Sequence, residues 1–142
     1  MINEKTNELS AAEADVLAAE AVKVLLEKLA LEVTMYDVRE HTSVTDFYVN
    51  ATGKSSTHVA SLADDVVDSF ESRGKNAYRV EGKRGNSWIL VDFGSLIVNV
   101  FDSEARSFYG FDRLLPAECG RDISDLAAEV DAKFSISDKE EI

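Results

Sequence analysis

The hydrophobic residues of this chain recur at helical spacing in some segments and at extended spacing in others. Over residues 10–30 and again over residues 55–73 they repeat every three or four positions, which predicts two helices with one buried face each. Ser10 and Glu13 have the spacing of a capping box and predict the start of the first helix, and Gly74 is expected to end the second. The expected buried stripe of the second helix consists of Val59, Leu62, Ala63, Val66, Val67 and Phe70.

Five segments rich in β-branched and aromatic residues predict strands. They cover residues 31–38, 46–52, 76–81, 88–92 and 96–101. The second and third strands, joined by a helix, are expected to form a right-handed parallel crossover, whereas the last two are expected to form an antiparallel hairpin. A helix near residues 123–134 is expected to be peripheral. The predicted fold class is α/β, a single domain with a mixed five-stranded sheet and flanking helices.

The composition divides the chain into three regions. Residues 1–9 are expected to form a flexible acidic tail, and residues 10–116 the α/β domain. Residues 117–142 are expected to be an acidic, helical C-terminal extension. The sequence contains no internal repeat and no linker that would split the domain in two.

The hairpin is expected to present two chemically different faces. With a turn at Phe93-Gly94, Asp92 would oppose Ser95, and Trp88 would oppose Asn99. The apolar face, expected to pack on the helices, consists of Ile89, Val91, Leu96, Val98 and Val100. The mixed face consists of Trp88, Leu90, Asp92, Ser95, Ile97, Asn99 and Phe101. Such a mixture is typical of a protein-binding surface, but a further strand or loop could equally cover the indole ring.

The chain is strongly acidic, because 27 Asp and Glu residues against 15 Lys and Arg give a formal net charge of −12. Such a protein repels a phosphate backbone, which argues against sequence-specific nucleic-acid binding and favours a basic protein partner. An equally good explanation is that the acidic ends only keep the chain soluble. No apolar run approaches the roughly 20 residues that a membrane span requires, so no membrane partner is expected. The first residues lack the pattern of a signal peptide, and the expected location is therefore the cytoplasm.

The motifs that could carry chemistry are incomplete. One cysteine, Cys119, and two histidines supply too few ligands for a structural zinc site, and no metal or cofactor is expected. Gly53-Lys54-Ser55 lacks the earlier glycine of a phosphate-binding loop, which favours a plain strand-to-helix turn. The alternative is a residual nucleotide-binding or nucleotidyltransferase-like enzyme that uses this segment and Asp64. No catalytic residue is assigned, and we do not expect an enzyme.

Several separate motifs between Asp37 and Arg113 resemble one known family. They are Asp37-Val38-Arg39-Glu40, Ser43-Val44-Thr45-Asp46-Phe47-Tyr48-Val49, Ala51-Thr52-Gly53, Ser55-Ser56-Thr57-His58-Val59, Val80-Glu81-Gly82, Trp88-Ile89-Leu90-Val91-Asp92-Phe93-Gly94, Val98-Asn99-Val100-Phe101, and Arg106 with Phe108-Tyr109. In this order they are similar to the ribosomal silencing factor family, also called RsfS or Iojap. The resemblance is specific because many motifs must agree at once, over more than half of the chain.

The resemblance implies a fold like that of nucleotidyltransferases, without their catalytic carboxylates. It also implies docking on ribosomal protein fourteen of the large ribosomal subunit, where these factors sterically block subunit joining and repress translation during starvation or stationary phase. The partner-binding residues that it implies are Trp88, Asp92, Asn99, Phe101, Arg106 and Tyr109.

Two positions depart from the family pattern. The family commonly has a histidine at the position of Asn99, and a tryptophan at the position of Leu115. The first difference puts any sensitivity to charge or pH at that position in doubt, and the second removes one aromatic anchor.

A homodimer that buries the mixed face on itself is the remaining interpretation.

Overall fold

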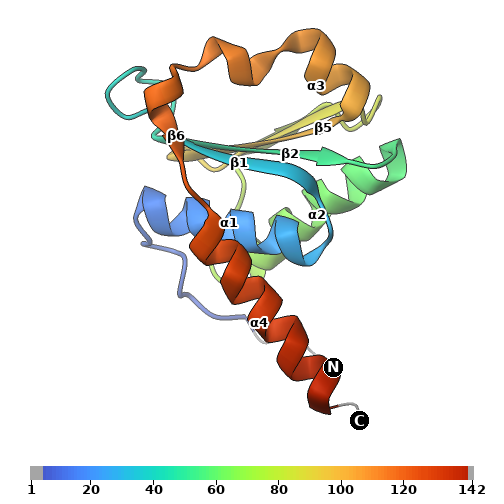
Figure 1. Cartoon of the computed structure of the whole chain (residues 1–142). Helices are drawn as coiled ribbons and strands as arrows, with labels where there is room; N and C mark the ends of the chain where they lie inside the picture. The colour runs from blue at the N-terminus through green and yellow to red at the C-terminus, as the bar shows by residue number, and fades with distance from the viewer. Residues whose placement is uncertain (1–4, 141–142) are drawn as a thin grey trace.

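The computed structural model describes residues 5–140, with side chains to residue 135, and shows one mixed sheet with helices on both faces (Figure 1). The strands are β1 (Leu31–Asp37), β2 (Phe47–Gly53), β3 (Arg79–Glu81), β4 (Trp88–Asp92), β5 (Leu96–Asp102) and β6 (Gly120–Arg121). The helices are α1 (Ala14–Glu27), α2 (Ser56–Ser72), α3 (Ser103–Tyr109) and α4 (Ser124–Glu140), with the short 3-10 helices η1 (Phe111–Leu114) and η2 (Ala117–Cys119). The strand order is β3-β4-β5-β2-β1-β6, and β2 with β5 is the parallel pair.

The hydrophobic core lies between the sheet and the layer of α1 and α2 (Figure 1). The predicted stripe of α2 is buried there, except for Val67, which is partly buried. Ser55 caps α2 by accepting a hydrogen bond from the His58 amide, and Gly74 follows the last turn with φ +92°. The predicted apolar face of the hairpin is completely buried. The alternation along β4 and β5 therefore correctly predicts which side of the sheet faces the core.

The sheet has six strands, so the prediction of five is wrong. The additional strand, β6, lies in the region expected to be a helical extension, and it pairs antiparallel with Met35 and Tyr36 of β1. A pair of residues, Gly120 and Arg121, is too short for alternation, and the sequence around them has no strand pattern.

β3 runs parallel to β2, as expected for the crossover between the second and third strands, but the two strands are not neighbours. β2 lies beside β5, whereas β3 forms the edge of the sheet beyond β4. The predicted hairpin register is wrong by two residues, since Trp88 opposes Phe101 and Asp92 opposes Ile97. The Phe93 amide donates to the Leu96 carbonyl, so Gly94, with φ +89°, and Ser95 form the turn. The turn therefore centres one residue later than expected. A shift of two residues leaves both faces unchanged.

The N-terminal segment differs from the predicted capping box and tail. α1 begins at Ala14 without a side-chain cap, and the Ser10 hydroxyl instead donates to the Asn7 carbonyl. The predicted tail includes residues 1–4, which lie outside the described residues. Within the remainder, the Leu9 amide bonds to the Arg73 carbonyl at the end of α2, and the Leu9 side chain is buried in the core.

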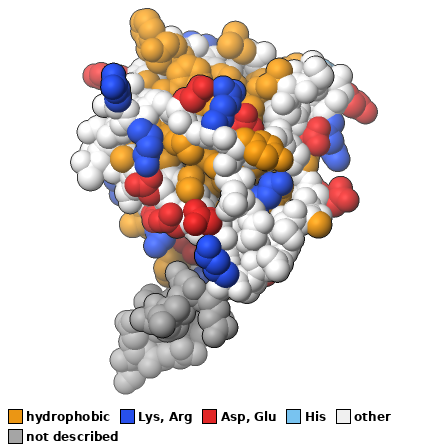
Figure 2. Space-filling view, turned by 180° about the vertical axis from the view of Figure 1, so that it is seen from behind, with side chains coloured by type: hydrophobic (Ala, Val, Ile, Leu, Met, Phe, Trp, Pro, Cys, Tyr) orange, Lys and Arg blue, Asp and Glu red, His pale blue; other side chains and the backbone are white. Residues whose placement is uncertain are grey.

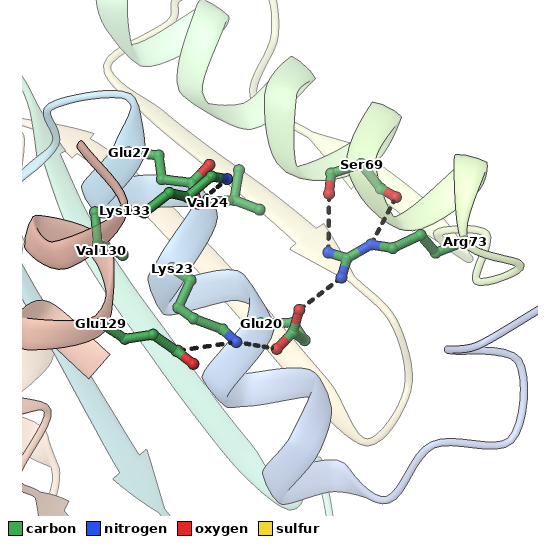
Figure 3. A pocket seen from close by; sticks show the side chains of 9 residues that line it. All are labelled: Glu20, Lys23, Val24, Glu27, Ser69, Arg73, Glu129, Val130 and Lys133. Carbon is green, nitrogen blue, oxygen red and sulfur yellow. Dashed lines mark hydrogen bonds and ion pairs between the residues drawn. The ribbon is translucent and has the colours of Figure 1, made fainter. Parts of the chain in front are cut away.

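The C-terminal helix α4 packs on α1 with charged side chains around the buried Val130 (Figure 3). The Lys23 ammonium bridges Glu20 at 2.6 Å and Glu129 of α4 at 3.1 Å, and Lys133 bonds to Glu27 at 3.1 Å. Figure 3 shows these side chains around a cavity of about 380 Å³ between α1, α2 and α4. Among the described side chains of α4, Val130 is the buried apolar anchor, and residues 141–142 of the predicted extension lie outside the described residues.

We expect the substitution Lys23→Ala to loosen α4 without disturbing the sheet. Partly exposed ion pairs contribute about 1 kcal/mol or less, which corresponds to roughly fivefold more frequent opening of α4. Amide hydrogen exchange should therefore accelerate in α4 and stay unchanged in β2 and β5. Lys28→Ala, an exposed lysine at the end of the same helix, is the control. Equal exchange in both variants would contradict the bridging role of Lys23.

Candidate functional site

The mixed face of the β4–β5 hairpin lies on the side of the sheet opposite α1 and α2, beneath α3 and η1 (Figure 1). The Trp88 ring packs against Phe101, with ring centroids 4.9 Å apart, and against Tyr109 of α3 at 5.0 Å. Phe111 of η1 contacts the same indole ring at 6.0 Å. Phe101 is fully buried and Trp88 partly buried. The covering segment, α3 with η1, thus lies over part of the mixed face and leaves the indole ring partly exposed.

The covering segment exposes aromatic side chains of its own. Phe108 is 80% exposed and Tyr109 52% exposed, and their rings lie 5.1 Å apart in an edge-to-face arrangement. Tyr109 links Phe108 to Trp88, and we call these three residues the aromatic patch. Figure 2 shows hydrophobic side chains gathered at the top of the molecule and across the centre of the rear face. Exposed large apolar groups in contact with one another are typical of a protein-binding surface.

An ion pair fastens this segment to the sheet. The Arg106 guanidinium donates to both carboxylate oxygens of Asp112, at 2.9 and 3.2 Å. It also donates to the Glu32 carbonyl at 2.6 Å, and to the hydroxyls of Thr34 and Thr52 at 3.0 Å. The side chain of Arg106 is only 11% exposed. Since Arg106 lies on α3 and Asp112 on η1, the pair holds both elements against β1 and β2.

The environment of Asp112 favours its charged form. Burial raises the pKa of the Asp112 carboxyl, but hydrogen bonds from Arg106 and Tyr36 outweigh burial and hold that pKa below its usual value of 3.8. The Tyr36 hydroxyl donates to the carboxylate at 2.6 Å. Burial, followed by this hydrogen bond, raises the pKa of Tyr36 in turn.

The lowered pKa of Asp112 predicts a specific dependence of stability on pH. Its contribution is fully present above pH 3.8 and is lost as the pH falls through the lower value of the folded state. The variant Asp112→Asn should therefore be less stable than the wild type at pH 7, and the difference should narrow towards pH 3. Urea unfolding of both proteins at pH 7, 5 and 3 measures this difference. A difference that does not change with pH would contradict the assignment.

The remaining predicted site residues occupy two places. Asn99 is buried at the centre of the sheet, where its amide oxygen accepts from the Trp88 indole nitrogen at 2.9 Å. Asp92 lies at the end of β4 opposite Trp88, about 13 Å from Trp88 at the usual rise per residue. It accepts from the Gly94 amide at 2.7 Å, which stabilises the hairpin turn, and from Arg79 of β3 at 3.1 Å, which joins β3 to β4.

The structure thus brings five of the six predicted residues together around α3. Only Trp88 and Tyr109 of these present open surface, since Asn99 and Phe101 are buried and Arg106 is committed to Asp112. Their role in partner binding stays a prediction. Sequence reasoning missed Phe108 as a surface residue and Asp112 as the partner of Arg106. The exposure of Phe108 depends on how α3 is docked, and the pair Phe108-Tyr109 in a short helix does not indicate which ring faces solvent.

The segment considered for nucleotide binding forms local contacts. The Lys54 amide donates to Nδ1 of His58 at 2.9 Å, and a Cβ at Gly53 would meet Val59 at 2.8 Å. Asp64 bonds to Lys83 at 2.6 Å on the outside of α2. No cluster of three metal-binding side chains occurs among the residues that the structure describes. Within the same part of the chain, no helix has the length and apolar character needed to span a bilayer.

The sequence and the fold both match known proteins. A family profile described as "Ribosomal silencing factor during starvation" matches residues 11–141. A Ribosomal silencing factor RsfS from Haemophilus influenzae is 33% identical over 97 residues, which cover 66% of this chain and 95% of the relative. A mouse protein named for mitochondrial assembly of the ribosomal large subunit is 26% identical over 66% of this chain and 42% of its own length.

A crystal structure of a protein from Chromobacterium violaceum superposes with a TM-score of 0.71 at 26% identity, covering 72% of this chain and 86% of that chain. The names of these RsfS relatives describe silencing of ribosomes, a regulatory role, and mention no enzymatic activity. With the family profile spanning nearly the whole sequence, this chain belongs to the ribosomal silencing factor family.

Proposed function

We propose that this protein acts in the cytoplasm by binding the large ribosomal subunit at ribosomal protein fourteen and sterically blocking subunit joining. Translation would thereby be repressed under starvation or in stationary phase. The observation that carries the proposal is the aromatic patch on a firmly anchored short helix, in a chain that belongs to the ribosomal silencing factor family.

The anchoring of the patch supports a docking role. Tyr109 and Phe108 lie on α3, which Arg106 ties to β1 and β2. Side chains held in place before binding lose little conformational entropy when a partner docks. Large aromatic groups at the centre of an interface also contribute a disproportionate share of the binding free energy.

The charge of the chain supports a protein partner over ribosomal RNA. At a net charge of −12, the protein is repelled by phosphate and attracted to a basic protein surface. A relative in mouse is named for assembly of the ribosomal large subunit, which favours the large subunit as the target.

The size of the protein suits a steric block. A compact chain of 142 residues has a radius of gyration of about 14 Å. A body of this size, seated on a surface that contacts the small subunit, would keep the two subunits apart without any catalytic step.

Sedimentation with separated ribosomal subunits tests this proposal. The wild type should co-migrate with the large subunit in a sucrose gradient and not with the small subunit. Migration with neither subunit would overturn the proposal. Sedimentation equilibrium of the free protein, run in parallel, shows whether a homodimer buries the aromatic patch instead.

A further inference from the structure

Two buried asparagines lie side by side beneath the aromatic patch. Asn50 of β2 and Asn99 of β5 are register partners in the parallel strand pair, and both are completely buried. The Asn99 amide nitrogen donates to the Asn50 side-chain oxygen at 3.1 Å, and the Asn99 oxygen accepts from the Trp88 indole nitrogen at 2.9 Å. The three side chains form one row of hydrogen bonds across β4, β5 and β2.

The chemistry of tryptophan fixes the direction of this row. An indole N–H can only donate, so the Asn99 oxygen must face Trp88 and the Asn99 NH₂ group must face Asn50. The Asn50 oxygen therefore accepts, and the Asn50 NH₂ group points away from Asn99. That nitrogen is buried and has no hydrogen-bond partner within the described residues.

The orientation of Asn50 connects the row to the anchor of α3. Asn50 is the register partner of Thr34, whose hydroxyl bonds to Asp112 at 3.1 Å. Its amide also adds to the groups that lower the pKa of Asp112, although it lies outside strict hydrogen-bond geometry. Asn50 therefore lies between the indole ring of Trp88 and the ion pair that holds Tyr109 in place.

We propose that Asn50 is a positioning residue that fixes the indole ring of Trp88, through Asn99, in the orientation that the partner recognises. The aromatic contacts with Phe101 and Tyr109 hold two sides of the indole ring, and the hydrogen bond to Asn99 holds its nitrogen edge. Without Asn50, the Asn99 NH₂ group loses its acceptor, and the bond to Trp88 alone then holds the Asn99 side chain. This role rests on the proposed function, because it concerns the same surface.

Trp88 is the only tryptophan of the chain, so a ¹⁵N spectrum contains a single indole signal. In the variant Asn50→Leu, we expect that signal to shift and its hydrogen exchange to accelerate about tenfold, since one hydrogen bond of the row is lost. Affinity for the large subunit should fall about tenfold, measured by sedimentation at fixed salt. Asn50→Ser, which shortens the side chain and withdraws the acceptor, should act in the same direction and serves if Asn50→Leu does not fold.

Thr45→Val is the matched control, because Thr45 is another buried polar residue that bonds to a carbonyl, that of Gly94 at 3.0 Å, at the far end of the sheet. Thr45→Val should lower the free energy of unfolding about as much as the Asn50 variants do. It should leave both the indole signal and the affinity unchanged. An unchanged indole signal in a folded Asn50 variant would overturn the positioning role. A shifted indole signal in an Asn50 variant that binds with wild-type affinity would also overturn it. A loss of affinity in Thr45→Val as large as in the Asn50 variants would do the same. Failure of the wild type to bind the subunit would instead count against the proposed function.

Discussion

Replacing Arg106 with alanine is expected to destabilise the protein by about 3 kcal/mol and to release α3 and η1 from the sheet. The guanidinium is 11% exposed and bonds to Asp112, Glu32, Thr34 and Thr52. Its removal leaves the Asp112 carboxylate partly buried with Tyr36 and Thr34 as its remaining donors. Breaking one side of such a pair costs more than forming the pair gains, because an uncompensated charge stays behind.

Urea unfolding followed by far-ultraviolet circular dichroism measures this loss, and hydrogen exchange locates it. Arg113→Ala is the matched control, since Arg113 lies on the same segment, is exposed, and makes one long hydrogen bond, of 3.5 Å, to the Ser107 carbonyl. It should change stability by less than about 0.5 kcal/mol. Similar stability losses for the two variants would show that Arg106 does not anchor the segment.

The second large effect is expected on binding. Tyr109→Ala should weaken affinity for the large subunit by roughly 30-fold or more, which corresponds to about 2 kcal/mol. Tyr109 is half exposed and contacts both Trp88 and Phe108, so its loss divides the aromatic patch. Trp88→Ala should cost at least as much, but part of that loss would come from the packing of Trp88 on buried Phe101.

Tyr78→Ala separates this effect from a general loss of exposed aromatic surface. Tyr78 is 74% exposed and packs beside Gly94, at the hairpin turn, away from the patch. The Tyr78→Ala variant should bind the large subunit like the wild type. If Tyr109→Ala stays folded and also binds like the wild type, the aromatic patch is not the docking surface.

Local patterns predict the two sides of the sheet but not its order. The alternation along Trp88–Asp92 and Leu96–Asp102 places Ile89 and Val98 in the core, whichever turn joins the strands. Strand neighbours depend on contacts between distant segments, and nothing in the sequence marks β5 rather than β3 as the neighbour of β2. The bond between Asn50 and Asn99 follows directly from that unpredicted pair.

The candidate site was predicted in its residues more than in their roles. The resemblance to the family leads to Trp88, Arg106 and Tyr109. Two of these lie on α3, and the third, Trp88, packs against it. It does not reveal that Arg106 faces inward, because its acceptors on β1 and β2 are more than fifty positions away in the sequence. The burial of Asn99 likewise depends on α3 and η1 covering this face, and the hydrophobic pattern of the sequence does not predict that covering.

The proposed block on subunit joining can be measured directly by light scattering while the two subunits associate. Large subunits preincubated with the wild-type protein should fail to form joined ribosomes, whereas preincubation with Tyr109→Ala should restore most of the signal. Tyr78→Ala should block joining like the wild type. Normal joining in the presence of large-subunit-bound wild-type protein would contradict the steric mechanism.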